Sequence, residues 1–157
     1  MVESHLNDRA RGLARGDQLI SQVVESPIER VFFMALHLNA DAGSPYNAFI
    51  SCKAGPAPAT APFDGLHVYL QATVDSYRVD GLCLLQIGDS VSFTVVECDG
   101  HDYHERTKEQ ASRDRSRDRH FAAKGWRVVR FTGSEIWRDP QRCAAELIDI
   151  VFGLNAE

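Results

Sequence analysis

The stretch Val91–Lys108, VSFTVVECDGHDYHERTK, decides how the rest of this chain is interpreted. Its first half is apolar and rich in β-branched residues, which is typical of a buried strand. The strand ends in two carboxylates, Glu97 and Asp99, which are two residues apart and therefore point to the same face. Desolvating such charges is costly unless a partner binds them, and hard cations such as Mg²⁺ prefer carboxylate oxygens. We therefore expect a metal site at the end of this strand.

The composition is that of an ordinary globular domain. The chain has 157 residues, of which 44% are hydrophobic and 25% are charged, and this length allows a substantial core. We expect one domain over residues 26–157. The N-terminal extension that precedes it, residues 1–25, has the scattered apolar positions of a loose helix.

Three features concern the compartment. No stretch approaches the roughly 20 apolar residues of a membrane span, and the charged N-terminus has no apolar signal-peptide core. The four cysteines have no CxxC spacing, which argues against a zinc ribbon or a disulfide framework. We therefore expect a cytoplasmic protein with no membrane partner.

The charge is unevenly distributed along the chain. The formal net charge is −5, but residues 105–130 hold nine Lys or Arg against four Asp or Glu, a local charge of +5. A local basic patch can contact phosphates whatever the total charge. The alternative is a charged helix that is simply solvated.

The expected element order is helix, three strands, helix, strand, helix. Ser26-Pro27-Ile28-Glu29 has the N-cap, the first-turn Pro and the acidic third residue of a helix start. The remaining elements are expected as strands at 66–74, 77–87, 91–98 and 126–131 and as helices at 105–124 and 140–152, and residues 48–52 are a candidate for one additional short strand. Short turns favour an antiparallel meander, and the helix before the last strand allows a crossover. The predicted fold class is α/β (α+β), a mixed sheet flanked by helices.

Four segments carry a resemblance to a known superfamily: SPIERVFF, YRVD, VVECDGHDYH and RDRSRDRHFAAKGWRVVRFTGSEI. Together they resemble the PD-(D/E)XK nucleases. Within that superfamily the chain is most similar to very-short-patch-repair-type endonucleases and the bacterial domains allied to them. The resemblance covers about residues 26–138, and it implies a restriction-endonuclease-like core of helix, three strands, helix and strand.

The resemblance also implies a set of site residues. Asp80 matches the metal-binding Asp of the second strand, and Glu97 matches the second acidic position. The main-chain carbonyl of Cys98 would be a further ligand, and Glu29 matches an acidic residue of the first helix. His104 matches a histidine that follows the Asp-Gly turn and would act in catalysis. The implied cofactor is Mg²⁺ or Mn²⁺.

One position departs from the superfamily pattern. The pattern ends in Lys, which helps to polarise the attacking water, whereas this chain has Asp99 there. Asp99 can bind or orient a metal but cannot donate a positive charge. Lys108, His101 and His104 are the candidates for the missing donor.

Several of these residues have a structural alternative. Asp80 and Asp99 each precede a glycine, and Asp-Gly is also typical of turns. Glu29 is placed to be the capping-box partner of Ser26. His104 is placed to cap the helix that follows it.

Basic residues of the predicted charged helix are candidates for DNA contacts: Arg106, Lys108, Arg113 and Arg117. By resemblance to an Asp-x-x-Arg-Asp pattern in the allied domains, Arg117 is expected to reach the site or a phosphate. Asp118 is expected to be a structural partner. The alternative for Arg113 is a salt-bridge ladder along the helix.

These observations predict a metal-dependent endonuclease that hydrolyses DNA phosphodiester bonds, in repair or restriction. The alternative is a nuclease-fold protein that binds nucleic acid without cutting it, because the Lys is missing. A third class is a partner-dependent component of a mobile-element, toxin or defence system. A structural zinc site from Glu97, Asp99, His101 and His104 is a lesser alternative.

Overall fold

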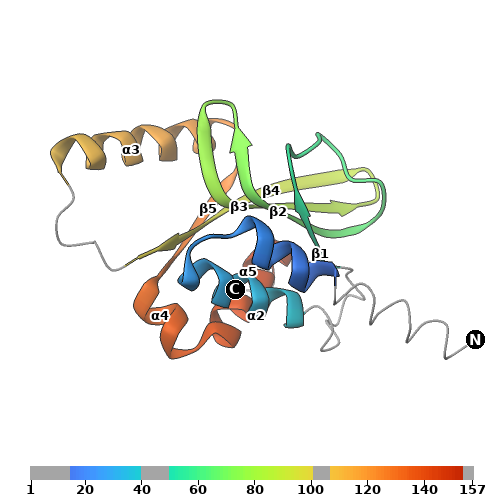
Figure 1. Cartoon of the computed structure of the whole chain (residues 1–157). Coiled ribbons are helices and arrows are strands. Elements are labelled where there is room, and N and C mark those ends of the chain that lie inside the picture. Colours follow the sequence, from blue (N-terminus) through green and yellow to red (C-terminus); the bar gives the residue numbers. More distant parts are fainter. Residues whose placement is uncertain (1–14, 40–49, 101–106, 154–157) are drawn as a thin grey trace, which may run out of the picture.

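A five-stranded sheet forms the centre of the computed structural model, which describes residues 15–39, 50–100 and 107–153 (Figure 1). The strands are β1 (Ile50–Ala54), β2 (Gly65–Val74), β3 (Tyr77–Ile87), β4 (Ser90–Asp99) and β5 (Arg127–Thr132). The helices are α2 (Pro27–Asn39), α3 (Lys108–Ala123), α4 (Gly133–Arg138) and α5 (Pro140–Phe152), and residues 15–23 form a further helix. None of the helices in these ranges is long and apolar enough to span a membrane.

The sheet is mixed, as predicted. Its strands lie in the order β1-β2-β3-β4-β5, with β2, β3 and β4 antiparallel to their neighbours in the meander. The edge strands β1 and β5 run parallel to β2 and β4. The α3 segment therefore serves as the crossover that returns the chain beside β4 in the parallel sense. This confirms the predicted fold class and the antiparallel meander.

The two faces of the sheet are covered unequally. The helix at 15–23, α2, α4 and α5 pack against one face, and Figure 1 shows α3 on the other side of the sheet. The helix-covered face holds the larger core, which includes Phe32, Phe33, Leu36 and Leu147. The α3 face holds a smaller core around the fully buried Phe121. The layer of four helices therefore buries most of one face of the sheet, whereas α3 packs against the smaller core on the other face.

Local signals explain where α5 begins and ends. The Asp139 carboxylate accepts a hydrogen bond from the Arg142 N–H at 3.0 Å, and Pro140 occupies the first turn. Gly153 ends the helix with φ 73°, a left-handed conformation that favours glycine. The prediction that Asp139-Pro140 opens the last helix is confirmed.

The structure corrects two helix predictions. The helix α3 begins at Lys108 and not at 105, because Thr107 is its N-cap in a capping box with Gln110. The helix α4 was not predicted; it is short, and its N-cap, Thr132, forms a capping box with Glu135. Thr132 and Glu135 have the same spacing as Thr107 and Gln110, three residues apart at the start of a helix. The sequence of α4 therefore did carry a recognisable capping-box pattern.

Candidate active site

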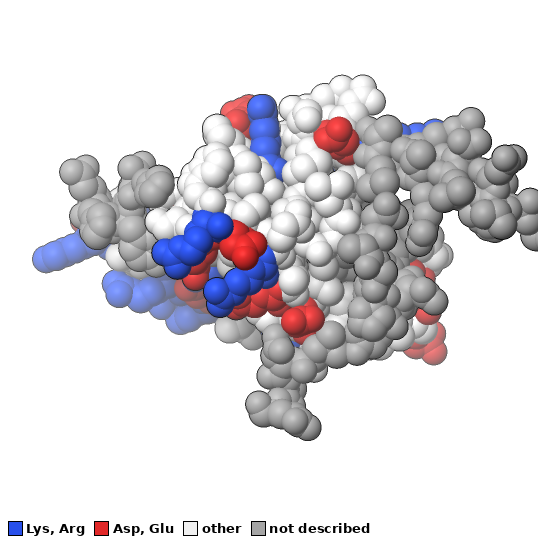
Figure 2. Space-filling model, turned by 90° about the horizontal axis from the view of Figure 1, so that it is seen from below, with Lys and Arg blue, Asp and Glu red and all other residues white. Residues whose placement is uncertain are grey.

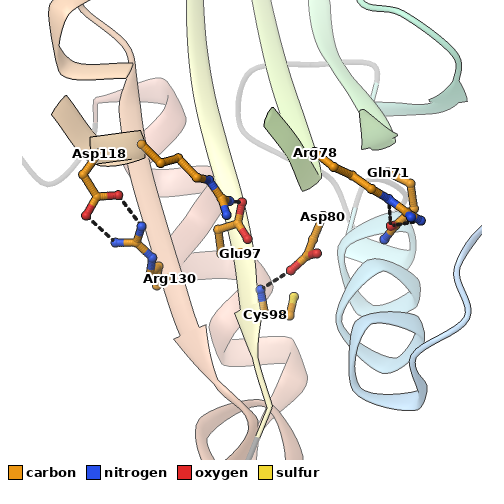
Figure 3. Close-up of polar contacts among 8 residues, drawn as sticks. Gln71, Arg78, Asp80, Glu97, Cys98, Asp118 and Arg130 are labelled. Carbon is orange, nitrogen blue, oxygen red and sulfur yellow. Dashed lines mark hydrogen bonds and ion pairs between the residues drawn. The ribbon is translucent and has the colours of Figure 1, made fainter. Parts of the chain in front are cut away.

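The candidate site lies where β3 and β4 separate. Their ladder ends at the pair Gly81–Val96, and beyond it β4 continues by pairing with β5 alone. The Cys98 N–H, which no longer faces a β3 carbonyl, donates instead to Oδ2 of Asp80 at 2.8 Å (Figure 3). A carboxylate thus replaces a main-chain partner at the opening of the sheet, which satisfies a buried donor.

An irregularity in β2 and β3 sets the position of Asp80. Before Gln71 the even residues of β2, such as Leu70, face the larger core, whereas after it Ala72 faces the smaller core. The register with β3 is unchanged across this point, and Gln71 has φ 49°, outside the strand region. In both strands, the residues that point to each face of the sheet therefore swap at Gln71 and Asp80, which face each other but are not paired in the ladder. The Asp80 side chain consequently departs from the regular in–out pattern of the strand.

Glu29 reaches the same region from α2. Nε2 of Gln71 donates to Oε2 of Glu29 at 2.5 Å, and Oε1 of Gln71 accepts from NH2 of Arg78 at 2.8 Å. Burial raises the pKa of Glu29, the charge of Asp80 raises it further, and hydrogen bonds from Gln71 and Ser26 lower it. Glu29 is therefore held by the side chains of Gln71 and Ser26 and lies in the field of Asp80.

The electrostatics around Asp80 oppose its ionisation. Burial is the largest cause that raises the pKa of Asp80, and the nearby Asp99 charge raises it further. The hydrogen bond from Cys98 and the positive charges of Arg117 and Arg78 lower this pKa. Carboxylates thus gather here in a partly dehydrated setting, where a cation would be favoured.

Glu97 faces α3 and is paired with Arg117. Glu97 alternates with Val95 on the α3 face of β4, and its carboxylate forms an ion pair with the Arg117 guanidinium. The two side chains are only 10% and 18% exposed. Burial lowers the pKa of Arg117, and the Arg130 charge lowers it further. Arg117 Nε is buried with no hydrogen-bond partner in the described part of the chain, so this guanidinium has unused donor capacity.

Asp118, the next residue of α3, has a structural role. Its two carboxylate oxygens accept from both terminal nitrogens of Arg130 on β5. This bond raises the pKa of Arg130 more than any other cause. The bidentate pair fixes α3 against β5 and thereby orients Arg117 toward Glu97. The expectation that Asp118 is a structural partner is confirmed.

Asp99 ends β4 beside the start of α4. It is half-buried and pairs in register with Thr132. A Cβ on Gly133 would lie 3.4 Å from the Asp99 carbonyl oxygen and 3.8 Å from the Gly100 Cα, which are ordinary van der Waals distances. Asp80 and Asp99 are both strand residues in the structure, which argues against the turn alternative for each.

The predicted site residues divide into three groups. Glu29, Asp80, Glu97, Cys98, Asp99 and Arg117 converge where α2, β3, β4 and α3 meet. Lys108 and Arg113 are exposed on α3. His101, His104 and Arg106 lie outside the described residues. Gln71 and Arg78 were not among the predicted site residues, although a lone Gln in the apolar run GLHVYLQATV was an available signal.

The donor chemistry of this cluster suits a hard divalent ion. No three His, Cys, Asp or Glu side chains in the described ranges are gathered as a ready-made metal site. Mg²⁺, however, is usually held by one or two carboxylates, with water and substrate phosphate completing its shell. Asp80 and Glu97, on neighbouring strands beside the Cys98 main chain, supply oxygen donors of that kind.

Comparison with known families identifies the group to which this protein belongs. The family model REase_MTES_1575, a restriction-endonuclease-like family, matches residues 63–151. The chain belongs to this family. The matched range holds Asp80, Glu97, Asp99 and Arg117, which places the core of the candidate site within it. Neither the curated proteins nor the solved structures gave a match.

Membership of this restriction-endonuclease-like family supports the nuclease-like superfamily that the sequence motifs predicted. It also suggests a nuclease function. The particular likeness to very-short-patch-repair-type endonucleases stays a prediction.

Proposed function

We propose that this protein is a metal-dependent endonuclease that hydrolyses phosphodiester bonds in DNA. The observation that carries the proposal is the pairing of Asp80 with the Cys98 main chain where β3 and β4 separate, with Glu97 beside it. The chain belongs to a restriction-endonuclease-like family, and the point where the β3–β4 ladder ends presents carboxylate oxygens that could bind a metal. Repair and restriction are the processes that such an activity would serve.

Each residue of the cluster has a definite task in this proposal. Asp80 and Glu97, together with the Cys98 carbonyl and Asp99, would hold the cofactor, Mg²⁺ or Mn²⁺. The bound ion would activate water and neutralise charge on the phosphate. Glu29 fixes Gln71 by its hydrogen bond and thereby supports the irregular backbone opposite Asp80.

Arg117 is the cation best placed to replace the missing Lys. It already contacts Glu97, and its buried Nε has no hydrogen-bond partner among the residues that the structure describes. An Arg guanidinium binds phosphate through two parallel hydrogen bonds and stays charged at all relevant pH values. Lys108 begins α3, about 13 Å along the helix axis from Arg117, which makes it a poorer donor for the same phosphate.

A second candidate function is DNA binding without cleavage. Asp99 stands where the superfamily has Lys, and Arg117 neutralises Glu97 without a metal. A protein of this kind would hold DNA through α3 and serve a partner in a mobile-element, toxin or defence system.

A cleavage panel separates the two candidates. Purified protein would be incubated with linear, nicked, branched and single-stranded DNA, each with Mg²⁺, Mn²⁺ or a chelator. The nuclease proposal expects scission of at least one form with metal and none with chelator. Binding of these DNAs without scission in any metal would favour the second candidate.

A further inference from the structure

The helix α3 has an exposed basic face that the candidate site does not use. Lys108, Ser112, Arg115 and Arg119 recur at i, i+4, i+7 and i+11 and therefore lie along one side of the helix. All four are exposed, and we call this set the outer face. Arg117, which reaches Glu97, points to the other side of the helix.

The fold does not require the outer face. Phe121 is the one buried residue of α3, and it lies in the last turn. The same end is fixed by Asp75, whose carboxylate lies 2.8 Å from both His120 Nε2 and Lys124 Nζ. In Figure 1 the N-terminal turns of α3 extend away from the sheet. The helix is therefore held near its C-terminal end, and its outer face is available to a partner.

The charges of the outer face oppose helix stability. Arg115 and Arg119 are like charges at i and i+4, a spacing at which they repel each other and destabilise a helix. Lys108 places a positive charge at the N-terminal end, against the helix dipole. The outer face contains no Asp or Glu, and its three cations have no ion-pair partner within the described ranges. A merely solvated helix usually alternates its charges, so this arrangement favours an anionic partner.

We propose that the outer face binds the phosphate backbone of duplex DNA, an inference that rests on the DNA substrate of the proposed function. From Lys108 to Arg119 the helix spans about 16 Å, and duplex DNA presents about ten phosphates over that length. The outer face has no aromatic side chain on which unpaired bases would stack, which disfavours single strands. A helix about 10–12 Å wide also fits a major groove about 12 Å wide.

The surface charge agrees with this assignment. In Figure 2, Lys and Arg side chains gather on the left of the molecule together with Asp and Glu, and Figure 1 places both α3 and α4 on that side. The remainder of the chain outside residues 105–130 is strongly acidic. An acidic body repels DNA, so duplex approach is favoured along this side.

The test is a salt titration of binding to a short duplex, in chelator so that no cleavage occurs. The double variant Arg115→Ala/Arg119→Ala removes two cations, and Ala preserves the helix. Each lost phosphate contact lowers the slope of log K against log [salt] by about 0.9, so the expected decrease is close to two. The matched control is Arg138→Ala/Arg142→Ala, which removes two exposed cations from α4 and α5.

The outcomes separate this inference from the proposed function. A reduced slope and weaker duplex binding in the Arg115/Arg119 variant, with the control unchanged, support the outer face as a DNA contact. An unchanged slope, or an equal change in the control, overturns it, as does an equal loss on single-stranded DNA of the same length. If the supporting result holds while the wild type cleaves no DNA in any metal, the outer face stands and the nuclease proposal fails.

Discussion

At the scale of single residues, the site is a set of carboxylates balanced by the half-buried Arg117 and by Arg78. Asp80 has its pKa raised by burial and by Asp99, and Glu97 is neutralised by Arg117. A cation that binds the folded state therefore relieves repulsion as well as assisting chemistry. Stability measurements can detect this without any assay of cleavage.

The first prediction concerns Asp80→Asn, which keeps an oxygen to accept from the Cys98 N–H. The pKa of Asp80 is higher in the folded protein than its ordinary value of 3.8. The protonated carboxyl therefore contributes stability that is fully present below pH 3.8 and is lost as the pH rises through the folded-state pKa. In chelator, the variant should therefore have a higher Tm than wild type at neutral pH and a similar Tm at low pH. Thermal melts across pH provide the measurement, and a variant less stable than wild type at neutral pH would contradict the account.

The second prediction concerns Arg117→Ala. This change leaves Glu97 buried without its partner, which should cost about 3 kcal/mol in chelator. The double variant Glu97→Gln/Arg117→Ala should cost less, because no charge remains unpaired. Denaturant unfolding measures both, and equal costs would show that the ion pair contributes nothing specific.

At the scale of elements, local sequence patterns predicted the positions of helices and strands but not the contacts between segments that are distant in the chain. The start of α5 followed from Asp139-Pro140, and the strands of the meander followed from their turns. The reversal of alternation at Gln71 and Asp80 could not be predicted, because both faces of β2 are buried and its sequence shows no alternation. The Glu97–Arg117 contact joins β4 to α3 across the sheet surface, and spacing along the chain does not reveal it.

The third prediction concerns how α3 is anchored. Phe121 is fully buried. The centroid of its ring lies 6.0 Å from that of Trp126, on which it stacks, and 5.8 Å from that of Tyr77. Phe121→Ala should destabilise the protein by about 3–5 kcal/mol. The exposed Arg113→Ala, on the same helix, should change stability by less than about 0.5 kcal/mol. Denaturant unfolding of both variants measures this, and a small effect of Phe121→Ala would mean that other contacts hold α3.

At the scale of the whole molecule, the helical layer fits closely onto the sheet beside the site. A Cβ on Gly81 would lie 2.8 Å from the Phe33 ring of α2, which no real packing tolerates. Gly81 directly follows Asp80, so the contact that seats α2 on the sheet also holds the strand at the point where it leaves β4. The element order was predictable, but this contact between layers was not, because it depends on how closely two distant segments approach.

The fourth prediction follows from this contact. Gly81→Ala should destabilise the protein by about 1–3 kcal/mol, because the added methyl forces Phe33 to move. Gly100→Ala is the control, since its Cβ would meet no atom of the described residues within 4 Å. Unfolding in denaturant compares the two, and equal stabilities would contradict the close fit of α2 on β3.

The central claim is that Asp80 and Glu97 support metal-dependent cleavage of DNA. Its most direct test is the single-turnover rate of strand scission with saturating Mg²⁺ for wild type, Asp80→Ala, Glu97→Ala and the exposed control Asp89→Ala. Loss of several kcal/mol of transition-state stabilisation should slow the first two variants by at least about 10³-fold, with the control at the wild-type rate. Cleavage at the wild-type rate by both Asp80→Ala and Glu97→Ala would contradict the account.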